Sequence, residues 1–313
     1  MQQVRSHWLE KVGHFLLASR TRAIVFVFLF SLVPFLAWVS KVIVGFVTLR
    51  KGPKEGALML LWAIMPAVVF AYLGHPWVLL FDAVIGGFLL WAMACILRAT
   101  GSWLRVLQLS LLVGSVGVIA AHCLHADIAS WWYHMIDQTY HDKLQMMKQD
   151  GLLLQAQEVG EMYGRFKDAG SLLWVSRMST GFAAMLSLAS TIVNLLMARW
   201  WQGLLFNPGG LRQELFRVYL TITPVFLALL CGVAMHFQQY LAWDLSPVLA
   251  LPLVFVGLLS CHRQFDGRRA AGLFLFMLYA LLFLFLPYSL VAVVGVGMLS
   301  TLMHWFQFIY RKK

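Results

Sequence analysis

Long apolar runs, separated by short loops that contain Lys or Arg, dominate the pattern of this chain. Several runs reach the ~20 residues that an α-helix needs to cross the ~30 Å hydrocarbon core of a bilayer. The runs are continuously apolar and do not alternate, which favours membrane helices over a β-barrel. The pattern predicts an all-α polytopic membrane protein with about eight transmembrane helices. These helices are expected over residues 56–73, 77–97, 103–123, 171–199, 218–237, 247–262, 270–286 and 288–308.

The first apolar run, residues 23–49, is long for one crossing and short for two. Pro34 and Lys41 interrupt it, and basic residues flank it on both sides. We interpret it as a broken or re-entrant N-terminal hairpin, which requires that protein covers its exposed backbone groups. The alternative is a single tilted crossing. Residues 1–22 place apolar side chains on one face, which predicts an amphipathic helix at the membrane interface.

Composition and charge agree with a membrane protein. Hydrophobic residues make up 61% of the 313 positions and charged residues 12%, well below the roughly one quarter that is usual in soluble domains. The net charge of +11 would suggest a nucleic-acid partner in a soluble protein. Here the basic residues lie in short loops between apolar runs, so they predict orientation instead, with both termini in the cytoplasm (N-in and C-in). We therefore expect the lipid bilayer, and no nucleic acid, as the partner.

Residues 126–169 differ from the rest of the chain because acidic and basic residues are frequent there. The segment predicts two amphipathic helices, separated near Gly151, on the extracytoplasmic surface. The chain thus divides into an interfacial helix (1–22), an N-terminal membrane bundle (23–125), this insertion (126–169) and a C-terminal membrane bundle (170–313).

A row of small and polar residues follows one face of the long helix expected from residue 171. Its members recur at alternating steps of four and three, which places them on one helix face. They are Ser176, Thr180, Ala183, Ser187, Ser190 and Asn194, which we call the small-polar seam. Such a face should point at protein or at a cavity. Helix packing is one reading, and a substrate pocket is the other.

Asp82 and Arg177 are the best candidates for charges inside the membrane. Each lies about six residues from the outer end of its expected helix, so the two lie at similar depth. A helix-locking ion pair between them would reduce the cost of ~2.5–3.5 kcal/mol for an unpaired charge at mid-membrane. The alternatives are a ligand anchor reached from outside and snorkelling to the interface.

A cytoplasmic elbow is expected after residue 199. The Asn207–Gly210 stretch has the composition of a turn, and its glycines allow positive φ. The arginines of the elbow could hold a lipid phosphate or dock an acidic partner. The elbow residues of interest are Arg199, Trp200, Trp201, Asn207, Gly209, Gly210, Arg212 and Arg217.

His134, Asp137 and His141 share a helix face in the insertion and are weak candidates for a metal site. No specific metal motif accompanies them, so surface histidines are the preferred reading, and no metal or cofactor is expected. The chain has no P-loop, no GxSxG and no kinase motif set. We therefore expect no enzyme; the competing hypothesis is an enzyme that uses this His/Asp cluster on lipid-linked substrates.

The elbow resembles the YybS-like family of uncharacterised bacterial inner-membrane proteins. The matching residues are Ala198–Trp201, the loop Asn207–Arg212 with Glu214 and Phe216, and a broken hairpin before the basic loop at Arg50–Gly52. The hydropathy pattern matches over most of the chain. The family has no agreed activity or catalytic residues to carry over. It is similar, distantly, to the substrate-binding membrane subunits of energy-coupling-factor vitamin transporters, although this chain has more crossings than their usual six.

The resemblance implies a bacterial inner-membrane protein of transporter-subunit type, which binds a small molecule or a lipid among its helices. Cytoplasmic ATPase subunits or other envelope proteins are then the candidate partners. The alternative is a membrane scaffold or assembly protein without a ligand, in which the small-polar seam is helix packing and the insertion is the partner surface.

Overall fold

The computed structural model describes residues 7–74, 76–125, 127–286 and 288–310, and all of its regular elements in these ranges are helical. The prediction of an all-α protein is confirmed. Several predicted features lie outside these ranges. They are the first six residues of the expected amphipathic helix, the turn residues His75 and Pro287, the segment boundary at Ala126 and the basic tail 311–313.

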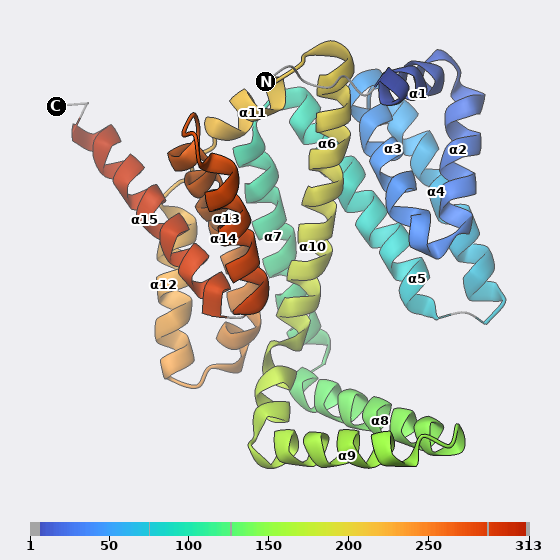
Figure 1. Cartoon of the computed structure of the whole chain (residues 1–313), viewed down its shortest axis with the longest axis vertical. Coiled ribbons are helices and arrows are strands. Elements are labelled where there is room, and N and C mark those ends of the chain that lie inside the picture. Colours follow the sequence, from blue (N-terminus) through green and yellow to red (C-terminus); the bar gives the residue numbers. More distant parts are fainter. Residues whose placement is uncertain (1–6, 75, 126, 287, 311–313) are drawn as a thin grey trace.

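The N-terminal part begins with a helix that lies across one end of the molecule, followed by a helical hairpin (Figure 1). The chain bends by 116° between the first two helices. Val33, which precedes Pro34, has extended backbone angles because proline disfavours the α region for its predecessor, and this ends the first arm of the hairpin. The elements are α1 (His7–Ala18), α2 (Arg20–Leu32), the 3₁₀ turn η1 (Pro34–Leu36) and α3 (Ala37–Lys51).

Three long helices follow the hairpin. One of them, Trp77–Thr100, contains a π-helical turn near its beginning and is otherwise α-helical. The elements are α4 (Pro53–Tyr72), α5 (Trp77–Phe81), the π turn η2 (Asp82–Gly86), α6 (Gly87–Thr100) and α7 (Trp103–Leu124).

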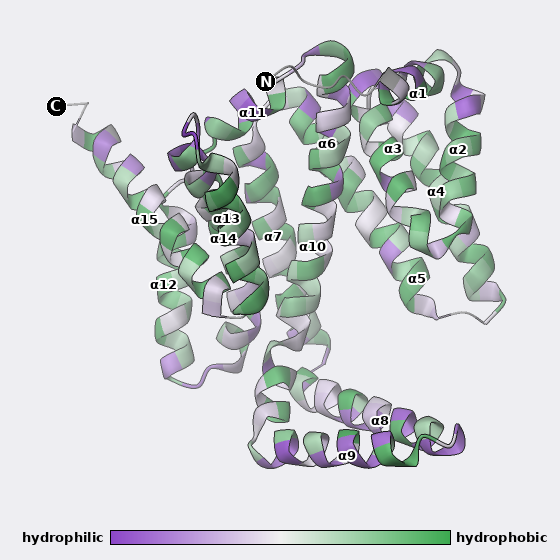
Figure 2. Cartoon of the chain, viewed as in Figure 1, coloured by the Kyte–Doolittle hydropathy of each residue, from purple (hydrophilic) through white to green (hydrophobic). Residues whose placement is uncertain are grey.

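The charged insertion forms two antiparallel helices, α8 (Ile128–Gln149) and α9 (Leu153–Asp168), at the end of the molecule opposite α1 (Figure 1). Gly151 joins them with a φ of 79°, a conformation that glycine adopts without strain. Polar residues concentrate on this hairpin, whereas the bundle helices are mostly apolar (Figure 2). Trp132 donates from Nε1 to Thr180 Oγ1 at 2.9 Å and so attaches the hairpin to the next helix.

The central helix α10 (Ser171–Phe206) has 36 residues and a length of about 54 Å. It packs against α3 on one side and α13 on the other, and it stands with α7 between the two groups of helices in Figure 1. The sequence predicted that this helix ends near residue 199. It continues to Phe206, because the first turn-forming residues are Asn207 and Gly209.

The C-terminal part contains α11 (Gly210–Phe216), α12 (Thr223–His236), α13 (Tyr240–Phe265), α14 (Ala271–Leu284) and α15 (Tyr288–Tyr310). The expected helix at 218–237 starts later, at Thr223, where Pro224 occupies a helix-initiating position. The expected helix at 247–262 starts earlier, at Tyr240, and includes Pro247. Pro247 has no N–H, so the Trp243 carbonyl lacks the hydrogen bond that it would normally accept within the helix. The Ser246 hydroxyl donates to that oxygen instead, at 2.9 Å.

Six helices among the described residues are long and apolar enough to cross a membrane, and α12 and α14 are apolar but shorter. The clearest sign of a lipid environment is α14, which carries no charged residue and has no buried residue. A helix that is apolar all round and unburied in the protein is stable only against lipid. The chain is therefore compatible with a multi-pass α-helical membrane protein.

Candidate functional site: an ion pair between broken helices

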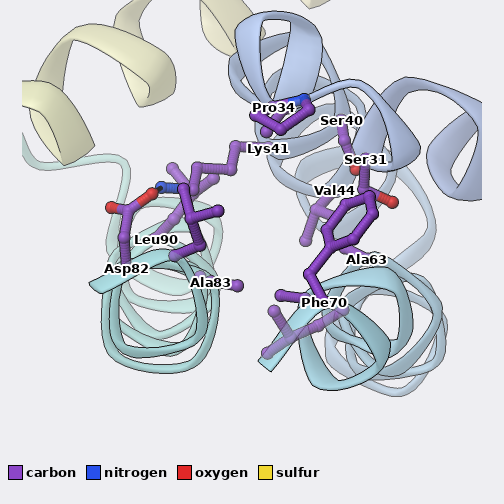
Figure 3. A pocket seen from close by; sticks show the side chains of 15 residues that line it. Ser31, Pro34, Ser40, Lys41, Val44, Ala63, Phe70, Asp82, Ala83 and Leu90 are labelled. Carbon is purple, nitrogen blue, oxygen red and sulfur yellow. Dashed lines mark hydrogen bonds and ion pairs between the residues drawn. The ribbon is translucent and has the colours of Figure 1, made fainter. Parts of the chain in front are cut away.

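An ion pair joins the N-terminal hairpin to the helix that contains the π turn. Lys41 Nζ on α3 donates to Asp82 Oδ2 at the start of η2, at 2.7 Å (Figure 3). The Lys41 side chain is 13% exposed and the Asp82 side chain 56% exposed. The Lys41 ammonium is therefore enclosed, while the Asp82 carboxylate is largely exposed.

This pair lines one side of a cavity of about 70 Å³ (Figure 3). Its walls come from the hairpin, α4 and the α5–α6 helix, with Pro34, Phe70 and Leu90 among the lining residues (Figure 3). Ser40 also lines it; this residue is 1% exposed, and its Oγ has no hydrogen-bond partner among the described residues. A buried hydroxyl without a partner is unfavourable unless a water or ligand group satisfies it, so the cavity offers an ammonium, a carboxylate and a free hydroxyl.

Two features of the sequence create the space for these groups. Pro34 interrupts the hairpin, and the π turn inserts an irregularity of a kind that is frequent at functional sites. Gly86 supplies the room next to the pair: a Cβ there would lie 3.0 Å from Asp82 Oδ1 and 3.3 Å from Lys41 Nζ. Discontinuous helices with charged groups at their breaks resemble the way in which transporters build sites near the membrane midplane.

The expected ion pair between Arg177 and Asp82 is wrong. Asp82 pairs with Lys41, and the Arg177 guanidinium lies over the ring of Tyr240, 4.7 Å from its centroid. The prediction matched the two charges by depth alone. It failed because α10 approaches α13 at the level of Arg177, while the hairpin brings Lys41 to Asp82.

Sequence reasoning missed a buried carboxylate, that of Asp244. Asp244 on α13 is 1% exposed; its Oδ1 accepts from the backbone N–H of Gly181 at 2.7 Å, and its Oδ2 lies 3.0 Å from His122 Nε2. Asp244 lies in the gap between the expected helices 218–237 and 247–262, whereas the observed helix already begins at Tyr240. The available signal was that Asp244 is the only acid between Tyr240 and Phe265 in a largely apolar stretch.

The small-polar seam is only partly directed at protein. Ser176 and Asn194 are buried, and Thr180 and Ser187 are half-buried, but Ala183 and Ser190 are exposed. The expectation of one continuous protein-facing row is therefore wrong at these two positions. The close-packed face of α10 is set by Gly181 and Leu188, which contact α13 and α7. Residues two positions further along a helix project about 200° away from that face.

The side chains of the seam do not line the cavity around Lys41 and Asp82. Thr180 Oγ1 accepts from Trp132 Nε1 on α8 at 2.9 Å, and Ser176 Oγ donates to the Leu172 carbonyl within the helix at 2.7 Å. The Ser176 bond is the ordinary behaviour of serine in helices. Of the residues predicted for an intramembrane pocket, only Asp82 lies at the cavity.

The elbow is held by contacts within the chain. Arg199 forms an ion pair with Glu214 and donates to Gln202 Oε1 at 2.6 Å. Trp201 stacks on Phe46 with ring centroids 4.8 Å apart, and its Nε1 donates to the Leu9 carbonyl at 3.0 Å. The Arg199–Glu214 pair thus joins α10 to α11, and the Trp201 contacts join α10 to α1 and α3.

The turn after α10 uses the predicted residues. Gly209 has a φ of 82°, and the Gly210 N–H donates to the Asn207 carbonyl at 3.0 Å. Arg212 is paired with Asp266, so this arginine and Arg199 are already neutralised by partners within the chain. Two further elbow residues are exposed: Trp200, at 47%, and Arg217, which directly follows α11.

The histidines of the insertion do not assemble a metal site. Among the described residues, no three or more His, Cys, Asp or Glu side chains converge in metal-binding geometry, and this includes His134 and His141. Asp137 Oδ1 instead accepts from Tyr163 Oη at 2.7 Å and from Lys167 Nζ at 2.9 Å. The bond from Tyr163 contributes most to lowering the pKa of Asp137, and the bond from Lys167 lowers it further. Burial, followed by the bond to Asp137, raises the pKa of Tyr163 above its usual range.

No family model matches the chain, and no curated protein and no solved structure gives a significant match. The resemblance at the elbow thus stays a prediction.

Proposed function

We propose that this chain is a multi-pass inner-membrane protein of transporter-subunit type, and that it binds a small molecule or a lipid group at the Lys41–Asp82 cavity. The observation that carries the proposal is an ion pair near the breaks of two helices, beside a buried Ser40 hydroxyl that has no partner among the described residues. Ionisable residues inside membrane segments are costly and are therefore usually functional. The exposed Asp82 carboxylate and enclosed Lys41 ammonium favour a ligand with both a hydrogen-bond donor and an anionic or carbonyl group.

The proposed topology places α1, α11 and the end of α15 in the cytoplasm and the α8–α9 hairpin outside. The support is that these elements lie at opposite ends of the molecule and that basic loops cluster at the first end. In this topology the hairpin α2–η1–α3 is re-entrant, because arms of 13 and 15 residues span only about 20 Å each. The short helices α12 and α14 complete eight crossings, α12 with the help of the irregular segment 218–222.

The transporter-subunit proposal implies that energy comes from a separate protein, since the chain has no P-loop. The partner surface would be the cytoplasmic end, around Trp200 and Arg217. Native mass spectrometry of protein released gently from its own membrane tests the proposal. The expected result is a bound small molecule or lipid that the Lys41→Met variant no longer carries, together with co-purifying ATPase subunits.

A non-enzymatic scaffold is the second candidate, and one observation favours it. The α8–α9 hairpin exposes apolar side chains on its surface, including Met146 at 63%, Leu154 at 79% and Met162 at 54%. Exposed apolar groups on a polar element are typical of partner or membrane contacts. If the scaffold proposal holds, deletion of 128–165 abolishes partner capture while the bundle stays folded and the Lys41–Asp82 cavity holds no ligand.

A further inference from the structure

A second, larger cavity of about 460 Å³ opens between α13 and α15 at the end of the bundle that carries α11. We call it the Arg263 pocket. It is separate from the Lys41–Asp82 cavity, since the two share no lining residue. Of the described residues that line it, none is acidic, while Arg263 and His304 contribute basic groups.

Arg263 is fixed in place by the protein but keeps donors free. Its Nη1 donates to the carbonyls of Phe216 and Val218, both at 3.3 Å, and its Nη2 donates to Ser260 Oγ at 3.0 Å. These bonds satisfy backbone carbonyls of the irregular segment before α12. An arginine has five N–H donors, so Nε–H and one Nη2–H have no partner among the described residues, and both belong to the fork that matches a phosphate.

Tyr219 positions the basic groups. The Arg263 guanidinium lies 4.4 Å from the centroid of its ring, and the His304 ring stacks on it at 3.9 Å with an interplanar angle of 13°. The guanidinium and the imidazole are thereby held as parts of one preorganised surface. Preorganised donors bind an anion at lower entropic cost than flexible side chains do.

One face of α15 changes from apolar to polar along the pocket. Val296, Leu299 and Met303 are exposed by 37%, 62% and 63%, and they recur at helical spacing. His304 and Gln307 follow toward the end of the helix. An acyl chain fits the apolar part and a charged headgroup fits the polar part, in the order that the cytoplasmic leaflet presents them.

We propose that the Arg263 pocket binds the phosphate ester of an anionic phospholipid headgroup. The apolar strip of α15 favours a lipid as the source of this phosphate, because it can accommodate an acyl chain. The phosphate oxygens accept from Arg263 Nε–H and Nη2–H. The ligand is held at the cytoplasmic end of the C-terminal bundle, where it fastens α15 to α13. A free phosphate has the same headgroup chemistry but gains nothing from the apolar strip.

Full-length protein that has been stripped of lipid tests the proposal by native mass spectrometry. Phosphatidylglycerol and phosphatidylcholine with identical acyl chains are titrated separately, and the affinity of the first bound lipid is measured. Gln264→Glu is the main variant, because Gln264 is exposed, lines the pocket and keeps its shape while it gains a negative charge. Gln213→Glu is the matched control, on an exposed position of α11 outside the pocket.

The expected result is that phosphatidylglycerol binds about tenfold more tightly than phosphatidylcholine, and that Gln264→Glu but not Gln213→Glu removes this preference. Met303→Glu, at another exposed lining position, should act in the same way and covers the case in which Gln264→Glu does not fold. Competition by inorganic phosphate with the same dependence on the variants supports the phosphate site but identifies a free phosphate as its source. Equal binding of both lipids, or equal effects of the two glutamate variants, overturns the proposal.

Discussion

Gly181 on α10 donates its backbone N–H to Asp244 on α13 at 2.7 Å, and the second oxygen of the same carboxylate lies 3.0 Å from His122 Nε2 on α7. One buried side chain thus joins three helices. The approach is very close, since a Cβ at position 181 would lie 1.7 Å from the Asp244 carbonyl oxygen. Polar groups in a membrane bundle act as such links because lipid offers them no alternative partner.

The first prediction concerns this crossing. Gly181→Ala should separate α10 from α13, break the Asp244 hydrogen bond and destabilise the protein by at least the ~1–3 kcal/mol that is usual for overpacking. Thermal unfolding in detergent measures the effect as a lower transition temperature. Gly117→Ala on α7 is the control, because a Cβ there meets nothing within 4 Å and alanine is the better helix former. Equal transition temperatures for the two variants would refute the close crossing.

The second prediction is an asymmetry within the Lys41–Asp82 pair. Asp82→Asn should destabilise the protein more than Lys41→Met does, because it leaves the enclosed ammonium unpaired, at a cost of up to ~2.5–3.5 kcal/mol. Lys41→Met leaves only a carboxylate that is already exposed. Denaturant titration of both variants measures the difference, with Lys54→Met at an exposed position as the charge-matched control. The reverse order would show that Lys41 is not the enclosed partner.

The third prediction is a pH dependence of the α8–α9 hairpin. The Tyr163 and Lys167 bonds hold the pKa of Asp137 below its usual value of about 3.9, so their stabilising contribution is present above about pH 4 and is lost as the pH falls through the lowered pKa. Amide hydrogen exchange of residues 128–168, corrected for intrinsic rates, should therefore accelerate below about pH 4. Tyr163→Phe should move the acceleration to higher pH, and an unchanged profile would contradict the assigned bond.

The fourth prediction concerns topology. In a variant without the four native cysteines, a membrane-impermeant thiol reagent added outside cells should label Gly151→Cys but not Gly267→Cys. The reagent should label Gly267→Cys after the cells are opened. Phe35→Cys, at the tip of the re-entrant hairpin, should resist labelling from either side. Labelling of Phe35→Cys from outside would instead support two full crossings by the hairpin.

Hydropathy in the sequence was sufficient to predict the class of fold and most helices, because the bilayer requires long apolar runs with satisfied backbones. It also indicated the break at Pro34 and the charged insertion with its joint at Gly151. Helix ends were less predictable: α10 continues to Phe206, and α13 begins at Tyr240, where Ser246 compensates for the N–H that Pro247 lacks.

The contents of the site were harder to predict than the fold. Depth in the membrane can be read from position along a helix, but the neighbour of a charged residue depends on which helices pack together. Arg177 and Asp82 share a depth but lie on helices with different neighbours, so the ion pair formed with Lys41 instead. The row from Ser176 to Asn194 likewise has the right spacing for one face, but the contact face of α10 is set by Gly181 and Leu188.

The central claim, a ligand held at the Lys41–Asp82 cavity, is tested most directly by native mass spectrometry of wild-type protein and of the charge-swapped variant Lys41→Asp/Asp82→Lys. The swap restores an ion pair between the two helices. If the pair has only a structural role, the variant should unfold at the same temperature as the wild type and carry the same bound molecules. The proposed function predicts that the wild type carries a bound small molecule or lipid and that the variant, with an unchanged thermal transition, has lost it. A wild-type protein without that ligand, or a variant that retains it, would contradict the account.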